Sequence, residues 1–359
     1  MELIHRNFCV LSGNKNLEDL PGIEKFPFFM GCVSHESKYD KFVEMKWGIE
    51  HKTGLIQLKK LIPLDVLYEN SHGSGSIGNI WTEHHKSFAK FINSISPESV
   101  LEIGGAHGIL SIEHDKIRKI PWTIIEPDPH PAKECKAIFI KGFFDNEFQT
   151  DSFVDTLVHS HVFEHIYYPN DFMSHISSFL KQDQNLVFSI PNLEVMLRKK
   201  YTNAINFEHT VFLTEPYIEF LLAKNHFRIL KKEYFLADHS IFYACVKDEN
   251  IKPFKLREDL YEKNKAIYIE YINFYNKLIL SLNKKIESYA KVHSIYLFGA
   301  HIFSQHLIIN GLNTKNIKYI LDNDKEKQNK RLYGTNIKVA SPKSLQKDKF
   351  PIVILKAGV

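Results

Sequence analysis

The stretch that decides the fold reads Ser99-Val100-Leu101-Glu102-Ile103-Gly104-Gly105-Ala106-His107-Gly108. An apolar strand runs into a turn of small residues, and the acidic Glu102 stands just before the first glycine. Glycines in such a turn let the backbone approach a ligand closely. The turn does not read Gly-x-Gly-x-x-Gly, so it lacks the helix-start turn that binds the pyrophosphate of a dinucleotide. A ligand site of another kind is therefore expected at the end of this strand.

The chain then alternates between strands and helices. A second strand, Trp122–Ile125, ends on Glu126, which lies a little over 20 residues past Gly104. An acid at this place accepts hydrogen bonds from ribose hydroxyls. The predicted strands are 99–103, 122–126, 137–141, 154–160, 185–190, 227–235 and 239–247. The last two read as a hairpin, so we expect an α/β fold with a mostly parallel, seven-stranded, Rossmann-like sheet and one antiparallel edge strand.

Three domains are expected along the chain. Residues 1–65 form a small first unit, residues 66–250 hold the main sheet, and residues 251–359 begin with a long helix over 256–291. Strands then resume and predict a second, smaller Rossmann-like unit. The connector over 68–78 is rich in glycine and serine, which fits either a flexible linker or a lid over a ligand. The chain stops at Val359 directly after a strand, so a truncation is expected there.

The composition is that of an ordinary globular protein. Hydrophobic residues make up 44% and charged residues 25%, and the net charge is +4. This charge is too small to indicate nucleic-acid binding, and arginine-rich stripes are absent. No apolar run is long enough to cross a membrane, and the first residues lack the apolar core of a signal peptide. The four cysteines follow no framework, which predicts reduced thiols and a cytoplasmic location.

The strand, the turn and Glu126 together resemble motif I of class I methyltransferases that use S-adenosylmethionine (SAM). The resemblance implies SAM as the cofactor. It also implies that residues after the third strand hold the adenine, with stacking by Phe144 and acceptance of the amino group by Asp145. His161 would lie near the methionine part of SAM. The expected cofactor-binding residues are Glu102, Gly104, Ala106, Gly108, Glu126, Phe144, Asp145 and His161.

Over essentially its whole length the chain is similar to the three-domain sugar C-methyltransferases of deoxysugar biosynthesis. The resemblance is carried by 101–108, 125–127, 161–165, 189–192, 208–209, 298–300 and 319–327. That family has an N-terminal zinc module, a central SAM domain and a C-terminal Rossmann-like domain. The same three-part architecture is therefore implied here.

The zinc module of that family uses two Cys-x-x-Cys pairs, and this chain departs from both. The first pair reads Cys9 to Ser12, and the second reads Glu50 to Thr53. One thiolate of four survives, whereas tetrahedral structural zinc needs four good ligands. We therefore predict a degenerate zinc-module fold and no metal site.

The catalytic segment of the family reads Tyr-His-Glu-His, and here it reads Asn206-Phe207-Glu208-His209. His209 is retained and is expected to act as the base, since histidine titrates near neutral pH, and Glu208 is expected to support it. Tyr68 aligns with a family tyrosine that reaches the active site. The catalytic candidates are thus His209, Glu208 and Tyr68.

These observations predict SAM-dependent methyl transfer to a small molecule, either a nucleotide-activated sugar or a related nucleotide-linked capsule precursor. Methylation at carbon requires an enolate. Because the catalytic segment is altered, O-methylation at a hydroxyl or a phosphate-type oxygen ranks at least level with it. Two alternatives stay open. One is an NAD-dependent sugar-nucleotide oxidoreductase or epimerase, and the other is a non-catalytic scaffold of a glycan assembly complex.

Overall fold

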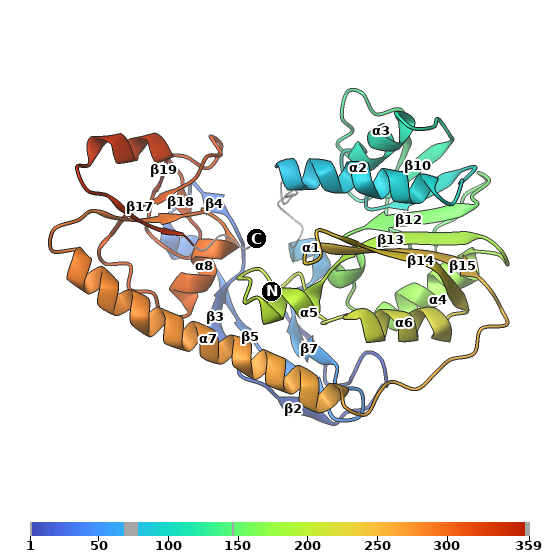
Figure 1. Ribbon diagram of the computed structural model, residues 1–359, viewed down its shortest axis with the longest axis horizontal. Coiled ribbons are helices and arrows are strands. Elements are labelled where there is room, and N and C mark those ends of the chain that lie inside the picture. Colours follow the sequence, from blue (N-terminus) through green and yellow to red (C-terminus); the bar gives the residue numbers. More distant parts are fainter. Residues whose placement is uncertain (1, 68–77, 146, 356–359) are drawn as a thin grey trace.

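The computed structural model describes residues 2–67, 78–145 and 147–355. Figure 1 shows a large sheet of green and yellow strands on one side and a smaller sheet of red and orange strands on the other. The blue N-terminal strands lie between them, and one long helix runs along both. The two sheets are the Rossmann-like units that the alternation of strands and helices predicts.

The large sheet has seven strands and confirms the predicted α/β class. Its order is β11-β10-β9-β12-β13-β15-β14. The five strands from β11 to β13 are parallel, and β15 runs antiparallel to β13. The strands span Val100–Ile103 (β9), Trp122–Glu126 (β10), Ile138–Lys141 (β11), Thr156–Ser160 (β12), Asn185–Pro191 (β13), Phe227–Phe235 (β14) and Ser240–Lys247 (β15).

The sequence predicted the antiparallel strand at the edge of the sheet, and this position is wrong. β15 is the second strand from the edge, and β14 is the outer one. All eight residues of β15 are buried, whereas β14 exposes Arg228, Lys231 and Lys232. An apolar strand needs cover on both sides, and a charged strand tolerates an open edge, where charge also discourages pairing with other chains.

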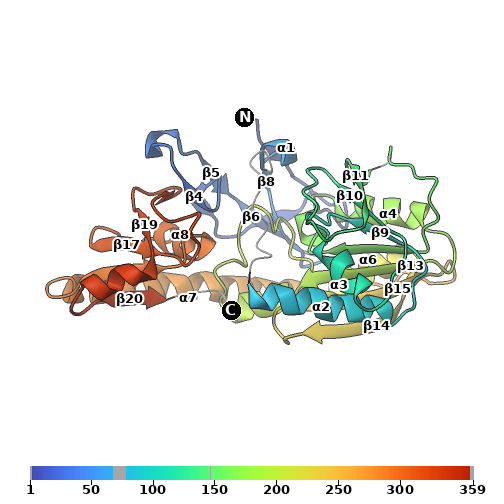
Figure 2. The same cartoon turned by 90° about the horizontal axis from the view of Figure 1, so that it is seen from above.

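Helices cover both faces of this sheet (Figures 1 and 2). On one face, Phe88 and Phe91 pack with Trp122 and Phe242. The other face carries a second apolar core around Phe188. The helices are α2 (Asn79–Asn93), α3 (Ile109–Asp115), α4 (Pro169–Phe179), α5 (Leu193–Arg198), α6 (Glu215–Lys224) and the 3-10 turn η2 (Phe163–His165). This layering leaves the carboxyl ends of β9, β10 and β12 for loops that can hold a ligand.

The N-terminal part consists of short strands that join both other parts. Three strands form the antiparallel sheet β2-β6-β7, and β4 pairs with β18 of the C-terminal part. Arg331 reinforces that pair, because its two terminal guanidinium nitrogens, Nη1 and Nη2, each donate to Asp40 at 2.6 Å. The elements are β1 (Ile4–His5), β2 (Leu17–Asp19), β3 (Ile23–Pro27), β4 (Cys32–Val33), η1 (Ser37–Tyr39), β5 (Phe42–Met45), β6 (Trp47–Glu50), β7 (Ile56–Leu58), β8 (Lys60–Leu61) and α1 (Leu64–Leu67).

The C-terminal part begins with the 30-residue helix α7, Leu260–Tyr289. Its buried tyrosines tie the three parts together: the Tyr268 hydroxyl donates to the Pro21 carbonyl at 2.7 Å, and that of Tyr271 to the Tyr201 carbonyl at 2.9 Å. A parallel sheet follows in the order β19-β17-β16-β20. The remaining elements are β16 (Ile295–Phe298), α8 (Ile302–Ile309), β17 (Ile317–Leu321), β18 (Arg331–Leu332), β19 (Val339–Ala340), η3 (Pro342–Lys347) and β20 (Ile352–Leu355).

Within the described ranges, none of the helices combines the length and apolar character that a bilayer crossing requires.

Candidate functional site

The glycine turn that follows β9 adopts a backbone that ordinary side chains resist. The φ angles are +73° at Gly104, +45° at Ala106 and +73° at Gly108. A Cβ atom at Gly104 would lie 2.9 Å from Cγ2 of Val162, and one at Gly108 would lie 2.3 Å from Sγ of Cys135. Glycine is therefore required at both positions for conformation and for space, and Ala106 holds a conformation that is rare outside glycine.

Glu126 ends β10 and lies directly beside this turn. Its Oε2 accepts a hydrogen bond from the backbone N–H of Ala106 at 3.0 Å, and its Oε1 accepts one from the N–H of Asp128 at 3.3 Å. The structure thus brings together two residues that the sequence analysis placed in one cofactor site. The half-buried carboxylate holds the turn in place at the carboxyl edge of the sheet.

Glu102 lies below the turn and is only 3% exposed. Its Oε2 accepts a hydrogen bond from Nε1 of Trp122 at 2.8 Å. Burial raises the pKa of Glu102 to about 7, the charge of Glu126 adds to this, and the bond from Trp122 opposes it. A Cβ atom at Gly105 would meet this carboxylate. The placement favours support of the turn from beneath over direct contact with a cofactor.

The two residues expected near adenine follow β11. Phe144 packs in a cluster of rings, with centroid distances of 4.5 Å to His175 and 5.3 Å to Phe179. Asp145 is exposed, and its Oδ1 accepts the N–H of Glu147 at 3.0 Å. Phe144 is half-buried, so part of the ring is committed to packing on α4.

His161 follows β12 with a left-handed φ of +54°. Both of its ring nitrogens have partners: Nδ1 lies 3.0 Å from Oε1 of Glu164, and Nε2 lies 2.8 Å from Oγ of Ser240. The strained backbone and the two contacts fix the ring in one orientation. The structure therefore connects this predicted cofactor residue to Glu164, a residue outside the predicted set.

An aromatic wall surrounds His161. Its ring centroid lies 4.8 Å from that of Trp81, 5.1 Å from that of His84 and 5.9 Å from that of His239. Burial lowers the pKa of His84 well below its ordinary value and that of His239 to about 4. The imidazole rings of His84 and His239 are therefore neutral at neutral pH. The sequence analysis did not find them, since α2 and the β14–β15 turn meet only in the folded chain.

The catalytic candidate His209 lies in the loop between α5 and α6, next to His165. Their ring centroids are 5.7 Å apart, and Nε2 of His165 lies 3.8 Å from Oε1 of Glu164. One ligand-type atom from each of Glu164, His165 and His209 lies within 4.8 Å of the other two. Both segments were predicted from the sequence, but the meeting of their side chains in one cluster was not.

The charges of this cluster are balanced by the surroundings. Burial of Glu164 opposes its ionisation and would raise its pKa. The charges of three neighbours, His161, His165 and His209, outweigh burial, and His161 also donates a hydrogen bond to the carboxylate. The pKa of Glu164 therefore falls to about 2. Burial lowers the pKa of His209 to about 4, and the neighbouring His165 adds to this, against the carboxylates of Glu164 and Glu208. At neutral pH the cluster thus holds a carboxylate and a neutral imidazole at His209.

Two residues fix the loop that carries His209. Oδ1 of Asn206 accepts the backbone N–H of Glu208 at 2.7 Å and that of His209 at 2.9 Å. Arg6 is fully buried and donates to the carbonyls of Leu58 at 2.9 Å, Tyr167 at 2.8 Å and Thr210 at 2.6 Å. Arg6 thereby joins the N-terminal part to the segments that carry His165 and His209.

The four positions of the degenerate zinc module also meet. Sγ of Cys9 lies 3.6 Å from Oγ1 of Thr53, and Oε2 of Glu50 accepts the N–H of Thr53 at 2.7 Å. Oε1 of Glu50 lies 3.4 Å from Nδ2 of Asn14, whose N–H donates to Oγ of Ser12 at 3.3 Å. Hydrogen bonds thus link the turn at 9–12 to the turn at 50–53. Tyr68, the remaining catalytic candidate, lies outside the described residues.

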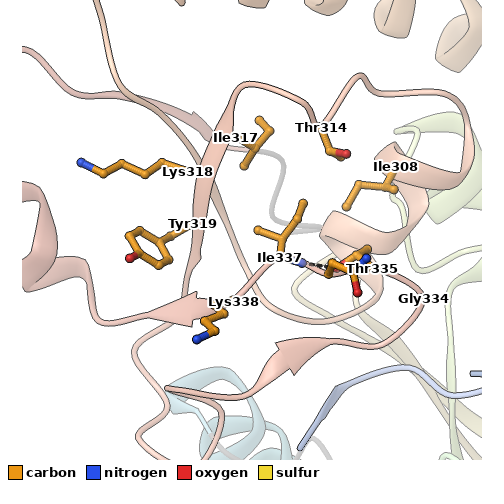
Figure 3. Close-up of a pocket in the computed structure, with 10 residues that line it drawn as sticks. Ile308, Thr314, Ile317, Lys318, Tyr319, Gly334, Thr335, Ile337 and Lys338 are labelled. Carbon is orange, nitrogen blue, oxygen red and sulfur yellow. Dashed lines mark hydrogen bonds between the residues drawn. The ribbon is translucent and has the colours of Figure 1, made fainter. Parts of the chain in front are cut away.

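A separate hollow of about 570 Å³ lies in the C-terminal part. Figure 3 shows Ile308, Ile317 and Ile337 on one side of β17, with Lys318 and Tyr319 on the other. None of the described site candidates lines it. We therefore place the candidate site at the carboxyl edge of the seven-stranded sheet.

The comparisons with known proteins match the part of the chain that forms the seven-stranded sheet. Residues 81–232 match the family model described as a methyltransferase domain. The range begins in α2 and ends in β14, so it includes the glycine turn, Glu126 and the Glu164 cluster. No curated protein matches the chain. The central part of the chain is therefore a class I SAM-dependent methyltransferase domain, and SAM is its cofactor.

Solved structures with a similar fold include two methyltransferases. One is the 1,6-didemethyltoxoflavin-N1-methyltransferase of Burkholderia thailandensis, with bound 1,6-didemethyltoxoflavin and S-adenosylhomocysteine. It has 14% identity and a TM-score of 0.38, over 48% of this chain and 82% of that one. Another is the N-methyltransferase NodS of Bradyrhizobium japonicum with S-adenosylhomocysteine, with 14% identity and a TM-score of 0.37, over 48% of this chain and 90% of that one.

Proposed function

We propose that this chain transfers the methyl group of SAM to a nucleotide-activated sugar or a related nucleotide-linked cell-surface precursor. The observation that carries the methyl-transfer site is the contact between its two halves. Val162, between His161 and Glu164 in sequence, packs against Gly104 so closely that a Cβ there would lie 2.9 Å away. A cofactor on the glycine turn would thus lie next to the Glu164 cluster. The sugar acceptor rests on the family resemblance.

In this proposal the site residues divide into two groups. The turn residues Gly104, Ala106 and Gly108 bind SAM with Glu126, which reaches the ribose hydroxyls, and Glu102 supports them. Phe144 and Asp145 border the adenine, and His161 orients Glu164. His209 takes the acceptor proton with Glu208 beside it, and Tyr68 stays a catalytic candidate on the family resemblance alone. The protein mainly holds donor and acceptor in line and excludes water.

The proposal also covers the organisation of the chain. We assign residues 1–65 to the degenerate zinc-module domain, 66–250 to the SAM domain and 251–359 to α7 with the second Rossmann-like domain. The four cysteines in the described residues are free thiols, which supports the proposal of a cytoplasmic location.

A screen for methyl transfer tests this function. Purified protein with methyl-labelled SAM is incubated with nucleotide-sugar extracts, and the label is followed into a product by mass spectrometry. Labelled nucleotide sugar is expected, and the methylated atom decides between carbon and oxygen. A protein that binds SAM but labels no extract would favour the scaffold alternative.

One observation keeps the oxidoreductase alternative worth testing. In the C-terminal unit the backbone N–H of Ala300 donates to Oδ2 of Asp322 at 2.8 Å. As in the large sheet, an acid that follows the second strand (here β17) accepts a hydrogen bond from the turn that follows the first strand (here β16). This relation is typical of nucleotide-binding units. Calorimetric titration with NAD distinguishes the two functions, since the methyltransferase proposal expects no NAD binding.

A further inference from the structure

The Glu164 cluster has the composition of a metal site. It combines one carboxylate with two imidazoles, and their ligand atoms lie within 4.8 Å of one another. Two histidines and one glutamate are a common ligand set for Zn²⁺ and for other divalent first-row ions. We propose that Glu164, His165 and His209 bind a divalent transition-metal ion such as Zn²⁺, which holds the acceptor oxygen. The role of the ion rests on the methyltransferase function proposed above.

An unsatisfied atom points to the same ligand. Glu164 is only 2% exposed, and its Oε2 is buried without a hydrogen-bond partner among the described residues. A buried carboxylate oxygen without a partner is costly, and a cation would satisfy it. The other oxygen, Oε1, lies 3.0 Å from Nδ1 of His161. Of the two carboxylate oxygens of Glu164, Oε2 is the one without a hydrogen-bond partner in the described part of the chain.

The surroundings supply the outer shell that metal ligands usually have. His161 fixes Glu164, and its other nitrogen lies 2.8 Å from Oγ of Ser240. Asn206 fixes the backbone of His209 through two hydrogen bonds. Such outer contacts orient ligands and raise affinity. A metal ligand at Glu164 would explain why His161 takes a strained backbone conformation, because that conformation directs its ring toward the carboxylate.

Small movements would complete the coordination. Metal–ligand bonds of about 2.0–2.2 Å place the ligand atoms of a tetrahedral site about 3.4 Å apart. One ligand-type atom from each of the three residues lies within 4.8 Å of the other two. Rotations of side chains close these gaps, and the backbone can stay where Asn206 and Arg6 hold it.

Three protein ligands leave a position open, which is typical of catalytic rather than structural sites. With the ion bound, an acceptor hydroxyl in that position would be more acidic and would release its proton to bulk solvent. The oxygen then forms a bond to the methyl carbon as the sulfur–carbon bond of SAM breaks. The products are a methyl ether, S-adenosylhomocysteine and one proton. This assignment replaces the role of base proposed above for His209 with that of a metal ligand, and the substrate class is a hydroxyl compound.

Titration of the full chain with Co²⁺ tests the site without any acceptor. Protein freed of metal with a chelator is titrated, and the visible absorption of bound Co²⁺ is recorded. We expect one ion per chain. Glu164→Gln and His209→Asn should each weaken binding by more than about 100-fold, and His161→Asn by about 10–100-fold. His51→Asn is the matched control, since His51 is an exposed histidine whose Nε2 lies 3.9 Å from Glu18.

Two outcomes would overturn the site: equal Co²⁺ affinity of wild type and Glu164→Gln, or loss of Co²⁺ binding in Cys9→Ala, which would place the ion in the N-terminal turns. Circular dichroism and thermal melting verify that each variant folds. SAM affinity, measured by calorimetry on the same samples, separates the two proposals. SAM binding without metal binding refutes this inference alone, and metal binding without SAM binding refutes the proposed function.

Discussion

The backbone N–H of Ala106 donates a hydrogen bond to Oε2 of Glu126, with 3.0 Å between the two atoms. The acid at the end of β10 is thereby joined to the turn at the end of β9, although 20 residues separate them. The second oxygen, Oε1, accepts the N–H of Asp128 at 3.3 Å, and in the proposed site it also faces the ribose. The same relation recurs between Ala300 and Asp322 in the smaller unit, which offers a matched control.

Glu126→Ala should weaken SAM binding. The variant loses hydrogen bonds from a charged group, which are worth about 1.5–3 kcal/mol, or about 10–150-fold in affinity. Calorimetric titration with SAM measures the change. Glu126→Gln can still accept the N–H of Ala106, so it separates the support of the turn from the contact with the ribose.

Asp322→Ala removes the equivalent acid of the C-terminal unit and should leave SAM affinity as it is. Equal affinities for wild type and Glu126→Ala would refute the ribose assignment. A loss confined to Asp322→Ala would move the cofactor to the second unit.

His209→Ala should reduce methyl transfer while SAM affinity stays near that of the wild type. For a hydroxyl or carbon acceptor, kcat should fall by about 10²–10⁴, which is the usual effect of losing a general base. The loss of a metal ligand that acidifies an acceptor hydroxyl acts in the same direction. For an acceptor oxygen that is already anionic, no proton is removed, and KM should rise instead. Steady-state kinetics with the identified acceptor measure both constants. If neither changes relative to the His51→Asn control, His209 is structural.

The sequence predicted the elements of the fold well because their signals are local. The seven strands of the large sheet follow runs of apolar residues, and the glycine turn is written in ten consecutive residues. The position of β15 inside the sheet was predicted wrongly. A hairpin fixes which strands pair, but the burial of each strand decides which one lies outside, and burial depends on the whole sheet.

The candidate site was predictable only in part. The turn and Glu126 share a known spacing, whereas Glu164 and His209 are 45 residues apart and meet through tertiary packing. The roles of single residues were harder still. Glu102 was expected to bind the cofactor, but its placement under the turn depends on the bond to Trp122, which lies on a neighbouring strand.

The N-terminal turns should bind no stoichiometric zinc. Three of the four ligand positions carry Ser12, Glu50 and Thr53, and hydrogen bonds already engage them. Elemental analysis of Glu164→Gln protein, purified without added metal, should find zinc well below one atom per chain. The Glu164→Gln change matters because it removes the other proposed site. Zinc at one per chain in this variant, with loss of the N-terminal fold on chelation, would contradict the prediction.

Arg6→Met should destabilise the protein by at least about 2 kcal/mol, because the carbonyls of Leu58 and Tyr167 lose the Arg6 donor and each loss costs about 1–3 kcal/mol. The carbonyl of Thr210 keeps the backbone N–H of Leu58 at 2.8 Å. The change in the free energy of unfolding is measured with urea. Arg6 also holds the carbonyl of Thr210, next to His209. Methyl transfer should therefore fall more than SAM affinity does. Arg6→Lys keeps the charge but has fewer donors, so its stability should lie between that of the wild type and that of Arg6→Met. If Arg6→Met were as stable as the wild type, the carbonyls would have found other partners.

Glu102→Gln should change how stability depends on pH. Burial raises the pKa of Glu102 from 4.5 to about 7 in the folded chain. A raised folded pKa means that the stabilising contribution is complete below about pH 4.5 and is lost as the pH rises through 7. The shift corresponds to about 3 kcal/mol. The amide of the variant would keep an oxygen to accept the N–H of Trp122 and would not ionise. The free energy of unfolding of SAM-free protein is therefore measured with urea at pH 5 and at pH 8. The wild type should lose this stability at pH 8, and Glu102→Gln should not. Equal losses in both proteins would exclude Glu102 as the group responsible.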